Sequence, residues 1–322
     1  MYNWKVGLVV GVVVLFAASV AQADEADSVS EREYWEVAVV ADLNGPYGSK
    51  DYNNHVHAAV DWLAEEVQPD LVITAGDMVA GQRQGLNYRG MWKAFHEAVT
   101  EPLAQAGIPF AVTPGNHDGS QQPKYWEERI EFALQWQMHR PRLRFVDDRY
   151  YPFHYAFEMG PALFISLDGT GIGDLDGAQI RWIERMLEQN DHEVVVMFSH
   201  VPQYPVADGR EDEVFGDERL AELKQEHQVD LMVTGHHHAY YPARSGETLL
   251  LYTHALGSGP RALLGEDEPR RRNAVVFRFD ETGIVGFDAY ESPEFDSVVD
   301  HDELPETLGE GDEKLQRYDL GS

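Results

Sequence analysis

Five short polar motifs contain the residue types that bind divalent metal ions. They are Asp42-Leu43-Asn44, Gly76-Asp77, Gly115-Asn116-His117-Asp118, Ser199-His200 and Gly235-His236-His237-His238. Carboxylate, amide oxygen and imidazole are ligands for magnesium, manganese, iron and zinc. Any one motif alone could be a helix cap or a turn. Because each of the five directly follows an apolar run, their repetition favours a shared metal centre.

The elements that position these motifs are buried strands. Six apolar runs lack polar alternation, which is typical of strands covered on both faces in α/β proteins. They are Val37–Ala41, Leu71–Ala75, Pro109–Thr113, Leu163–Leu167, Val194–Phe198 and Leu231–Thr234. Helical spacing occurs at His55–Val67, Tyr88–Ala104, Lys124–Met138, Gln179–Gln189 and Glu218–Glu226, and further strands are predicted at Thr248–Tyr252, Asn273–Asp280 and Ile284–Tyr290. Polar strand ends of this kind are where ligands bind in α/β sheets.

The ordered motifs resemble the calcineurin-like metallophosphoesterase family, whose blocks are Asp-x-His, Gly-Asp, Gly-Asn-His-Asp/Glu, a lone His and Gly-His-x-His. The resemblance runs from about Glu36 to Tyr290, and four blocks are intact. It implies an α/β fold, a four-layer α-β-β-α sandwich of two mixed sheets. The first block departs from the family, since Asn44 replaces the histidine. Purple acid phosphatases also lack that histidine but supply a tyrosine where this chain has Ala80, so that branch is a poor match.

The resemblance implies two metal ions bridged by Asp77. One ion would take Asp42, Asp77 and His238, with Asn44 as a possible further ligand, and the other would take Asp77, Asn116, His200 and His236. The metals could be manganese, iron, magnesium or zinc. An amide oxygen is a harder and weaker donor than imidazole, so Asn44 favours weaker binding of the first ion and a preference for manganese, magnesium or iron.

The same resemblance implies hydrolysis of phosphoric esters. Paired ions supply hydroxide near neutral pH for in-line attack on phosphorus. His117 is the candidate that protonates the leaving oxygen, and Asp118 would orient His117. His254, after a predicted strand, and Arg261, after a glycine-rich turn, are candidate substrate contacts. His237 lies between two ligands on an extended segment and is expected to point away from them.

Composition limits the partners and the ligand types. The 322 residues include 56 acidic and 25 basic residues, for a formal charge of −31, and no cysteine. A chain this acidic repels duplex nucleic acid as a non-specific ligand, because such binding depends on lysine and arginine at phosphates. Thiolate metal sites and disulfides are excluded. Only six of the bases are lysine, a composition that suits either concentrated salt or an ordinary acidic secreted protein.

The two ends of the chain differ from the middle. Residues 1–23 carry one charge, an apolar run and Ala21-Gln22-Ala23 before acidic residues, the pattern of a cleavable secretory signal peptide. We therefore expect a periplasmic or secreted bacterial protein with no membrane span after cleavage. A leader (24–35), a catalytic domain (36–290) and an acidic tail (291–322) follow. The tail holds eleven acidic residues, which favours a solvated segment, although docking through Phe295 or Leu315 stays open.

The sequence thus predicts an exported, metal-dependent hydrolase of phosphate monoesters or diesters acting on a small phosphorylated substrate. The alternative is a weakly active or inactive metal- or ligand-binding relative, in which Asn44 has emptied one of the two sites. Nothing in the sequence selects between monoester and diester, or fixes the oligomeric state.

Overall fold

The computed structural model describes Met1, residues 34–311 and residues 314–318. The predicted signal peptide over residues 1–23 therefore lies, apart from Met1, outside the described residues, as does most of the leader. Within the described ranges, no helix combines the length and apolar character needed to cross a membrane.

A five-stranded mixed sheet carries the first three motifs. Its order is β12 (Gly283–Glu291), β11 (Asn273–Asp280), β1 (Trp35–Val40), β2 (Leu71–Thr74) and β3 (Phe110–Ala111). Strands β1, β2 and β3 run parallel, whereas β11 is antiparallel to both of its neighbours. Parallel strands present their carboxyl ends at one sheet edge, so the motifs after β1, β2 and β3 are gathered there.

A nine-stranded mixed sheet carries the remaining motifs. Its order is β13 (Thr307–Leu308), β14 (Leu315–Arg317), β9 (Tyr241–Ser245), β10 (Thr248–Tyr252), β8 (Leu231–Thr234), β7 (Val194–Phe198), β6 (Ala162–Ser166), β5 (His154–Met159) and β4 (Arg144–Tyr150). Its central strands β6, β7, β8 and β10 are parallel. The histidine motifs follow β7 and β8 and so lie at one edge of this sheet.

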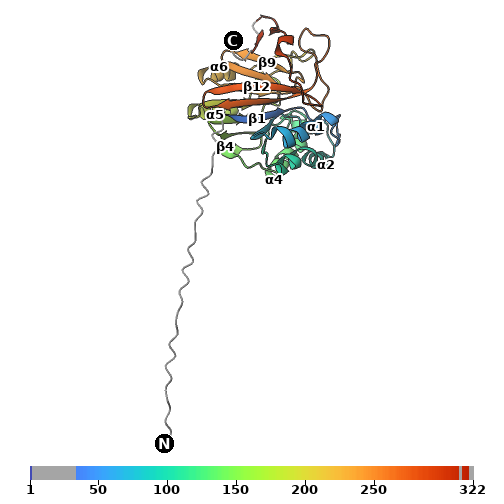
Figure 1. The fold of residues 1–322 in the computed structure, drawn as a ribbon, viewed down its shortest axis with the longest axis vertical. Helices are drawn as coiled ribbons and strands as arrows, with labels where there is room; N and C mark the ends of the chain where they lie inside the picture. Colours follow the sequence, from blue (N-terminus) through green and yellow to red (C-terminus); the bar gives the residue numbers. More distant parts are fainter. Residues whose placement is uncertain (2–33, 312–313, 319–322) are drawn as a thin grey trace. The chain divides into compact units, whose positions relative to one another are not determined.

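The helices form two groups, visible in Figure 1, where α1, α2 and α4 lie away from α5 and α6. They are α1 (Asn54–Trp62) with the π-helix η1 (Leu63–Val67), α2 (Tyr88–Phe95) with the π-helix η2 (His96–Thr100), α3 (Glu101–Gln105), α4 (Trp126–Met138), α5 (Gly177–Glu188) and α6 (Glu218–Glu226), with 3-10 turns η3 (Pro123–Tyr125) and η4 (His301–Glu303). Aromatic pairs join the layers: Trp62 of α1 with Tyr290 of β12, Trp136 of α4 with Phe110 of β3, Phe279 of β11 with Phe164 of β6, and Trp182 of α5 with His154 of β5. The fold is the expected α-β-β-α sandwich.

Strands β4, β5 and β9 were not expected from the sequence. The hairpin β4–β5 ends the nine-stranded sheet, and the side chains of β4 are mostly exposed, so it lacks an apolar run. Strand β9 contains Pro242, which weakens any strand pattern. The long helical pattern predicted at residues 55–67 ends in a π-helical segment, and the one at residues 88–104 is divided by one.

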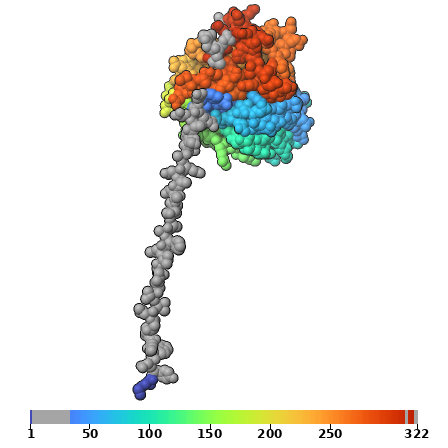
Figure 2. Space-filling view, viewed as in Figure 1, coloured from blue at the N-terminus to red at the C-terminus, as the bar shows by residue number. Residues whose placement is uncertain are grey.

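The expectation of a solvated acidic tail is wrong for the described part of residues 291–318. Strands β13 and β14 pair with each other, and β14 pairs with β9. Phe295, Leu304, Leu308 and Leu315 are buried, while the acidic residues between them are mostly exposed. In the space-filling view the red C-terminal residues lie directly against the orange part of the chain (Figure 2). A few well-spaced apolar side chains therefore dock a segment whose average composition is highly charged.

The docking of the tail predicts a large effect of a single substitution. Phe295 is 4% exposed and stacks on Trp62 with ring centroids 4.7 Å apart. Phe295→Ala should lower the free energy of unfolding by about 3–5 kcal/mol, because it removes a buried ring from a packed interface. Urea unfolding measures this loss. The control Val298→Ala, at a side chain 49% exposed, should change stability by less than about 0.5 kcal/mol; equal effects of the two would contradict docking.

Candidate metal centre

The candidate ligands are held by unusual backbone conformations. Eight described non-glycine residues have positive φ, and four of them are Asp42, Asp77, His236 and His238, with φ of 52, 57, 65 and 54°. Such angles are uncommon for residues with a side chain and concentrate at functional sites. Strands β1, β2 and β8 are therefore followed by left-handed backbone positions at their ligand residues.

Two glycines make room for the ligands. A Cβ atom at Gly115 would lie 2.1 Å from Oδ1 of Asp77, and one at Gly76 would lie 2.7 Å from Nδ1 of His200. Gly76 also has φ +87°, which favours glycine. The glycines of the Gly-Asp and Gly-Asn-His motifs are thus required by close approach of backbone to ligand.

One group of ligand atoms converges around Nε2 of His200. This nitrogen lies 2.7 Å from Oδ1 of Asn116, 3.2 Å from Nδ1 of His236 and 3.4 Å from Oδ1 of Asp77. His200 is fully buried. These four residues are the set assigned to one ion by the sequence resemblance, and the structure brings all of them together.

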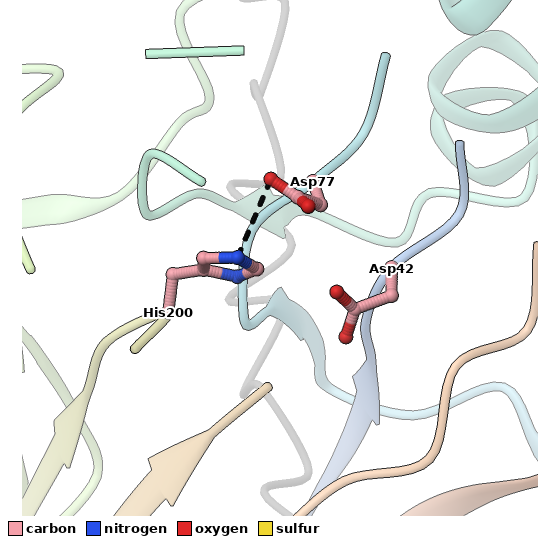
Figure 3. A group of neighbouring side chains, drawn as sticks. All are labelled: Asp42, Asp77 and His200. Carbon is pink, nitrogen blue, oxygen red and sulfur yellow. Dashed lines mark ion pairs between the residues drawn. The ribbon is translucent and has the colours of Figure 1, made fainter. Parts of the chain in front are cut away.

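A second group forms around Asp42, which is also fully buried. Its Oδ1 lies 3.1 Å from Nε2 of His238 and, among the described residues, accepts no hydrogen bond. Ligand atoms of Asp42, Asp77 and His200 all lie within 4.8 Å of one another, and Figure 3 shows the three side chains, from separate strand ends, around one space. A buried carboxylate oxygen without a donor fits a metal ion, because an unpaired charge is otherwise costly to bury.

The histidine rings are oriented by hydrogen bonds on the side away from the centre. In each ring one nitrogen faces the ligand cluster and the other has a protein acceptor, which fixes the tautomer that leaves a lone pair for a metal. The acceptors are the Ala75 carbonyl for Nδ1 of His200 (2.7 Å), the Glu213 carboxylate for Nε2 of His236 (2.9 Å) and the Gly259 carbonyl for Nδ1 of His238 (2.8 Å). The donor set therefore fits two transition-metal or magnesium ions.

Without bound metal, the pKa shifts of the ligand residues show that positive charge stabilises this site. Burial alone would raise the pKa of Asp77, but the neighbouring His200 and His117 hold the pKa of that carboxyl well below its usual value. Burial would lower the pKa of His200, yet Asp77 and Asp42 raise it to about 9. Burial and then the nearby His200 hold the pKa of His236 well below its usual value. In the metal-free protein, a proton on His200 thus partly neutralises the buried carboxylates. A bound metal cation would take over that role.

Asn44, the departure from the family pattern, lies at this centre. It is 3% exposed, and its Oδ1 is 2.5 Å from Oγ of Ser258, which is also 3.0 Å from the Asn44 backbone oxygen. A hydroxyl has one hydrogen and cannot donate fully to both oxygens. A half-turn of the amide would let Nδ2 donate to Ser258 and would free Oδ1 for a cation, so the surroundings of Asn44 are compatible with a ligand role.

His117 lies beside the centre but is not part of the ligand cluster. Its Nε2 is 3.9 Å from Oδ2 of Asp77, and its ring stacks on Tyr47 with centroids 5.3 Å apart. The expectation that Asp118 orients His117 is wrong. The Asp118 carboxylate accepts the backbone N–H groups of Met78 and Gly115, each at 2.6 Å. Asp118 therefore joins the turns that carry Asp77 and Asn116, and the stacking with Tyr47 orients His117.

The remaining sequence candidates have different positions. His254 is 1% exposed and its Nδ1 lies 3.2 Å from the Ala255 carbonyl oxygen, so its role as a substrate contact stays a prediction. His237 is buried and contacts the backbone of Val206 and Glu213, away from the ligand cluster. Arg261 is half-buried, and its backbone N–H donates to the His238 carbonyl.

Three residues at the site were missed by sequence reasoning. They are Tyr47, Arg210 and Glu213, all in loops outside the five polar motifs. Glu213 accepts from His236, and Arg210 pairs with Glu213. An Arg-x-x-Glu spacing in an acidic loop does not by itself indicate a functional site. The contacts of Arg210 and Glu213 could therefore be found only from the folded structure.

A family model for calcineurin-like phosphoesterases matches residues 36–240. The chain belongs to the calcineurin-like phosphoesterase family. Its similar curated proteins include purple acid phosphatase 18 of Arabidopsis thaliana, 32% identical over 46% of this chain and 34% of that protein. A probable glycerophosphodiester phosphodiesterase, GpdQ of Arcobacter nitrofigilis, is 30% identical over 53% of this chain and 57% of its own length. The DNA double-strand break repair protein Mre11 of Halobacterium salinarum is 25% identical over 75% and 54%.

This family member thus spans between about a third and just over half of these relatives. Solved structures show the same fold at low identity. The purple acid phosphatase PPD1 of yellow lupin has a TM-score of 0.60 at 18% identity, over 84% of this chain and 53% of that one. A dimetal phosphatase from Danio rerio has a TM-score of 0.52 at 16% identity, over 76% and 95%. Purple acid phosphatases, disfavoured on sequence because of Ala80, are therefore among the similar proteins, although Ala80 has no side-chain ligand.

Behind the His117 turn of this phosphoesterase lies a buried carboxyl group. Glu128, 1% exposed, accepts the backbone N–H of Gln82. A Cβ atom at Gly81 would lie 2.4 Å from Oε2 of Glu128 and 2.2 Å from the His117 carbonyl oxygen. Burial, and to a lesser degree the charges of Asp118 and Asp77, raise the pKa of Glu128 to about 8. The Glu128 carboxyl is therefore protonated at neutral pH.

This raised pKa predicts a pH dependence of stability. Because the usual pKa of Glu128 is 4.5 and the folded one about 8, folding favours the protonated form, and its contribution is lost as the pH rises from 5 to 8. Glu128→Gln should remove roughly 1–3 kcal/mol of that decline, measured by urea unfolding with a chelator present. The exposed neighbour Glu127→Gln should keep the wild-type decline. An unchanged slope in Glu128→Gln would overturn the assignment.

Proposed function

We propose that this protein is a metal-dependent hydrolase of phosphoric esters with a two-metal centre. The observation that carries the proposal is the convergence of six candidate ligands from five strand ends, including a buried Asp42 oxygen without a hydrogen-bond donor. Bound ions would activate a water molecule and offset the charge of the phosphoryl oxygens. The family membership supports this chemistry.

The protein's own residues would supply positioning and a proton. Asp77 has a ligand atom within 4.8 Å of ligand atoms of both Asp42 and His200, one from each ligand group, and would bridge the two ions. His117, with a side chain 22% exposed and a ring held by Tyr47, is accessible to a bound ester. We assign its Nε2 to protonating the departing oxygen, since that nitrogen faces the centre while Nδ1 is buried.

An assay with two substrates tests the proposal. The protein loaded with manganese, magnesium, iron or zinc should hydrolyse p-nitrophenyl phosphate or bis-p-nitrophenyl phosphate, and chelation should abolish the activity. Absence of hydrolysis with every metal would contradict the proposal and favour the alternative of an inactive metal-binding relative, in which Asn44 fails to hold its ion.

His117→Ala tests the proton donor in the same assay. A poor leaving group such as an alkoxide needs the proton, whereas p-nitrophenolate needs it much less. We expect kcat to fall by roughly 10²–10⁴-fold on an alkyl phosphate and by much less on the nitrophenyl ester, with metal content unchanged. The exposed His57→Ala serves as a control at wild-type activity. Equal losses on both esters would exclude a proton-donor role.

We also propose export, and a small phosphorylated substrate. Export is supported by the signal-peptide pattern of residues 1–23, and a small substrate by the formal charge of −31, which disfavours duplex nucleic acid as a non-specific ligand. Comparing the N-terminus of the protein recovered from the periplasm of a bacterial host with that of the full chain tests cleavage after Ala23.

A further inference from the structure

Two arginines lie in neighbouring loops at the rim of the metal centre. The loop containing Arg210 and the loop containing Arg261 are joined by an antiparallel bridge between Ala207 and Leu263, and the Asp208 N–H donates to the Ala262 carbonyl at 3.1 Å. In this register Arg210 and Arg261 follow the end of the bridge. The backbone therefore places the two arginines near each other, and the charge of Arg261 acts on Arg210.

Both arginines are connected to the Gly-His-x-His motif by hydrogen bonds and ion pairs. Arg210 pairs with the Glu213 carboxylate, which lies 2.9 Å from Nε2 of His236. The Arg261 N–H donates to the His238 carbonyl at 3.2 Å. Arg261 thus contacts a candidate ligand residue directly, and Arg210 does so through Glu213.

The charge environment of this pair is unusual for the chain. Acidic residues outnumber basic residues by 56 to 25, yet Arg261 forms no ion pair within the described residues, and its Nε is buried without a hydrogen-bond acceptor. Burial and the neighbouring Arg261 lower the pKa of Arg210. Two arginines on bridged loops, one of them with an unused buried donor, can form a receptor for an anion.

The nature of the anion follows from the chemistry of esters. A phosphate monoester has an additional ionised oxygen where a diester has a second ester group. Guanidinium groups form strong paired hydrogen bonds with ionised phosphate oxygens, whereas an ester oxygen is a weak acceptor with an organic substituent attached. A pair of arginines beside the centre therefore discriminates between the two ester classes.

We propose that Arg210 and Arg261 together bind the ionised, non-reacting oxygen of the substrate phosphate and make this protein a phosphate monoesterase. The inference rests on the proposed hydrolase function, since it names the substrate class of the same centre. Arg210 would exchange part of its contact with Glu213 for the phosphate, while the unused Nε–H of Arg261 supplies a second donor.

Binding of two anions, one resembling a monoester product and one resembling a diester, tests the proposal separately from hydrolysis. Isothermal titration of the manganese-loaded protein would compare inorganic phosphate, which represents the monoester product, with dimethyl phosphate, which represents a diester. The variants are Arg210→Gln and Arg261→Gln. The control is Arg244→Gln, because Arg244 also pairs with a glutamate three residues later, Glu247, but lies on β9. Metal content is measured for every variant.

We expect phosphate to bind the wild type and the control equally, and each of the other variants about tenfold more weakly. Dimethyl phosphate should bind weakly to all proteins. Wild-type phosphate binding by both variants, or dimethyl phosphate binding as tight as phosphate, would overturn the proposal. Loss of metal from Arg210→Gln would instead assign Arg210 to holding Glu213 and His236 and would remove it from the receptor. An inactive wild type that binds phosphate as expected would overturn the hydrolase function alone.

Discussion

Two buried carboxylates, Asp42 and Asp77, set the electrostatic requirement that the rest of the site meets. Both are almost completely inaccessible to water, and burying such charges is costly unless cations compensate them. Without metal, His200 supplies part of that compensation, as its pKa of about 9 shows, while one Asp42 oxygen remains without a donor. The three histidines and Asn116 surround these carboxylates in the arrangement that two metal ions would complete.

In the sandwich, the strand ends position the metal ligands and the loops supply the other residues of the site. The ligands lie in turns just beyond the carboxyl ends of β1, β2, β3, β7 and β8, so rigid sheets fix their separation. This positioning requires backbone strain, seen as positive φ angles at four ligands. It also requires a close approach of the backbone at Gly76 and Gly115 to ligand side chains. The loops then add Tyr47, which stacks on His117, and Arg210 and Arg261, which we propose bind the substrate phosphate. On that proposal, the strand ends hold the metal ions and the loops select the ester.

The sequence predicted most of the core and the ligand set, and it failed where the signal is not local. The strands that end in ligands are apolar runs, and their motifs have fixed spacing, so both could be recognised. Strand β4, with mostly exposed side chains, and the docked tail around Phe295 lack that pattern, because average charge conceals a few buried residues. Asp118 was misassigned because adjacency in sequence was taken for contact, whereas its carboxylate accepts backbone N–H groups. Glu213 reaches His236 only through the tertiary fold.

We propose that two metal ions share the Asp77 carboxylate. Equilibrium dialysis followed by elemental analysis, applied to the wild type, Asp42→Asn and Asp77→Asn, tests it most directly. Both variants keep the shape of the side chain and remove its charge. We expect two ions per wild-type chain, loss of one from Asp42→Asn, and loss of both from Asp77→Asn, because the Asp77 carboxylate lies within 4.8 Å of ligand atoms of both groups. A folded Asp77→Asn protein that retains two ions with wild-type affinity would contradict the account.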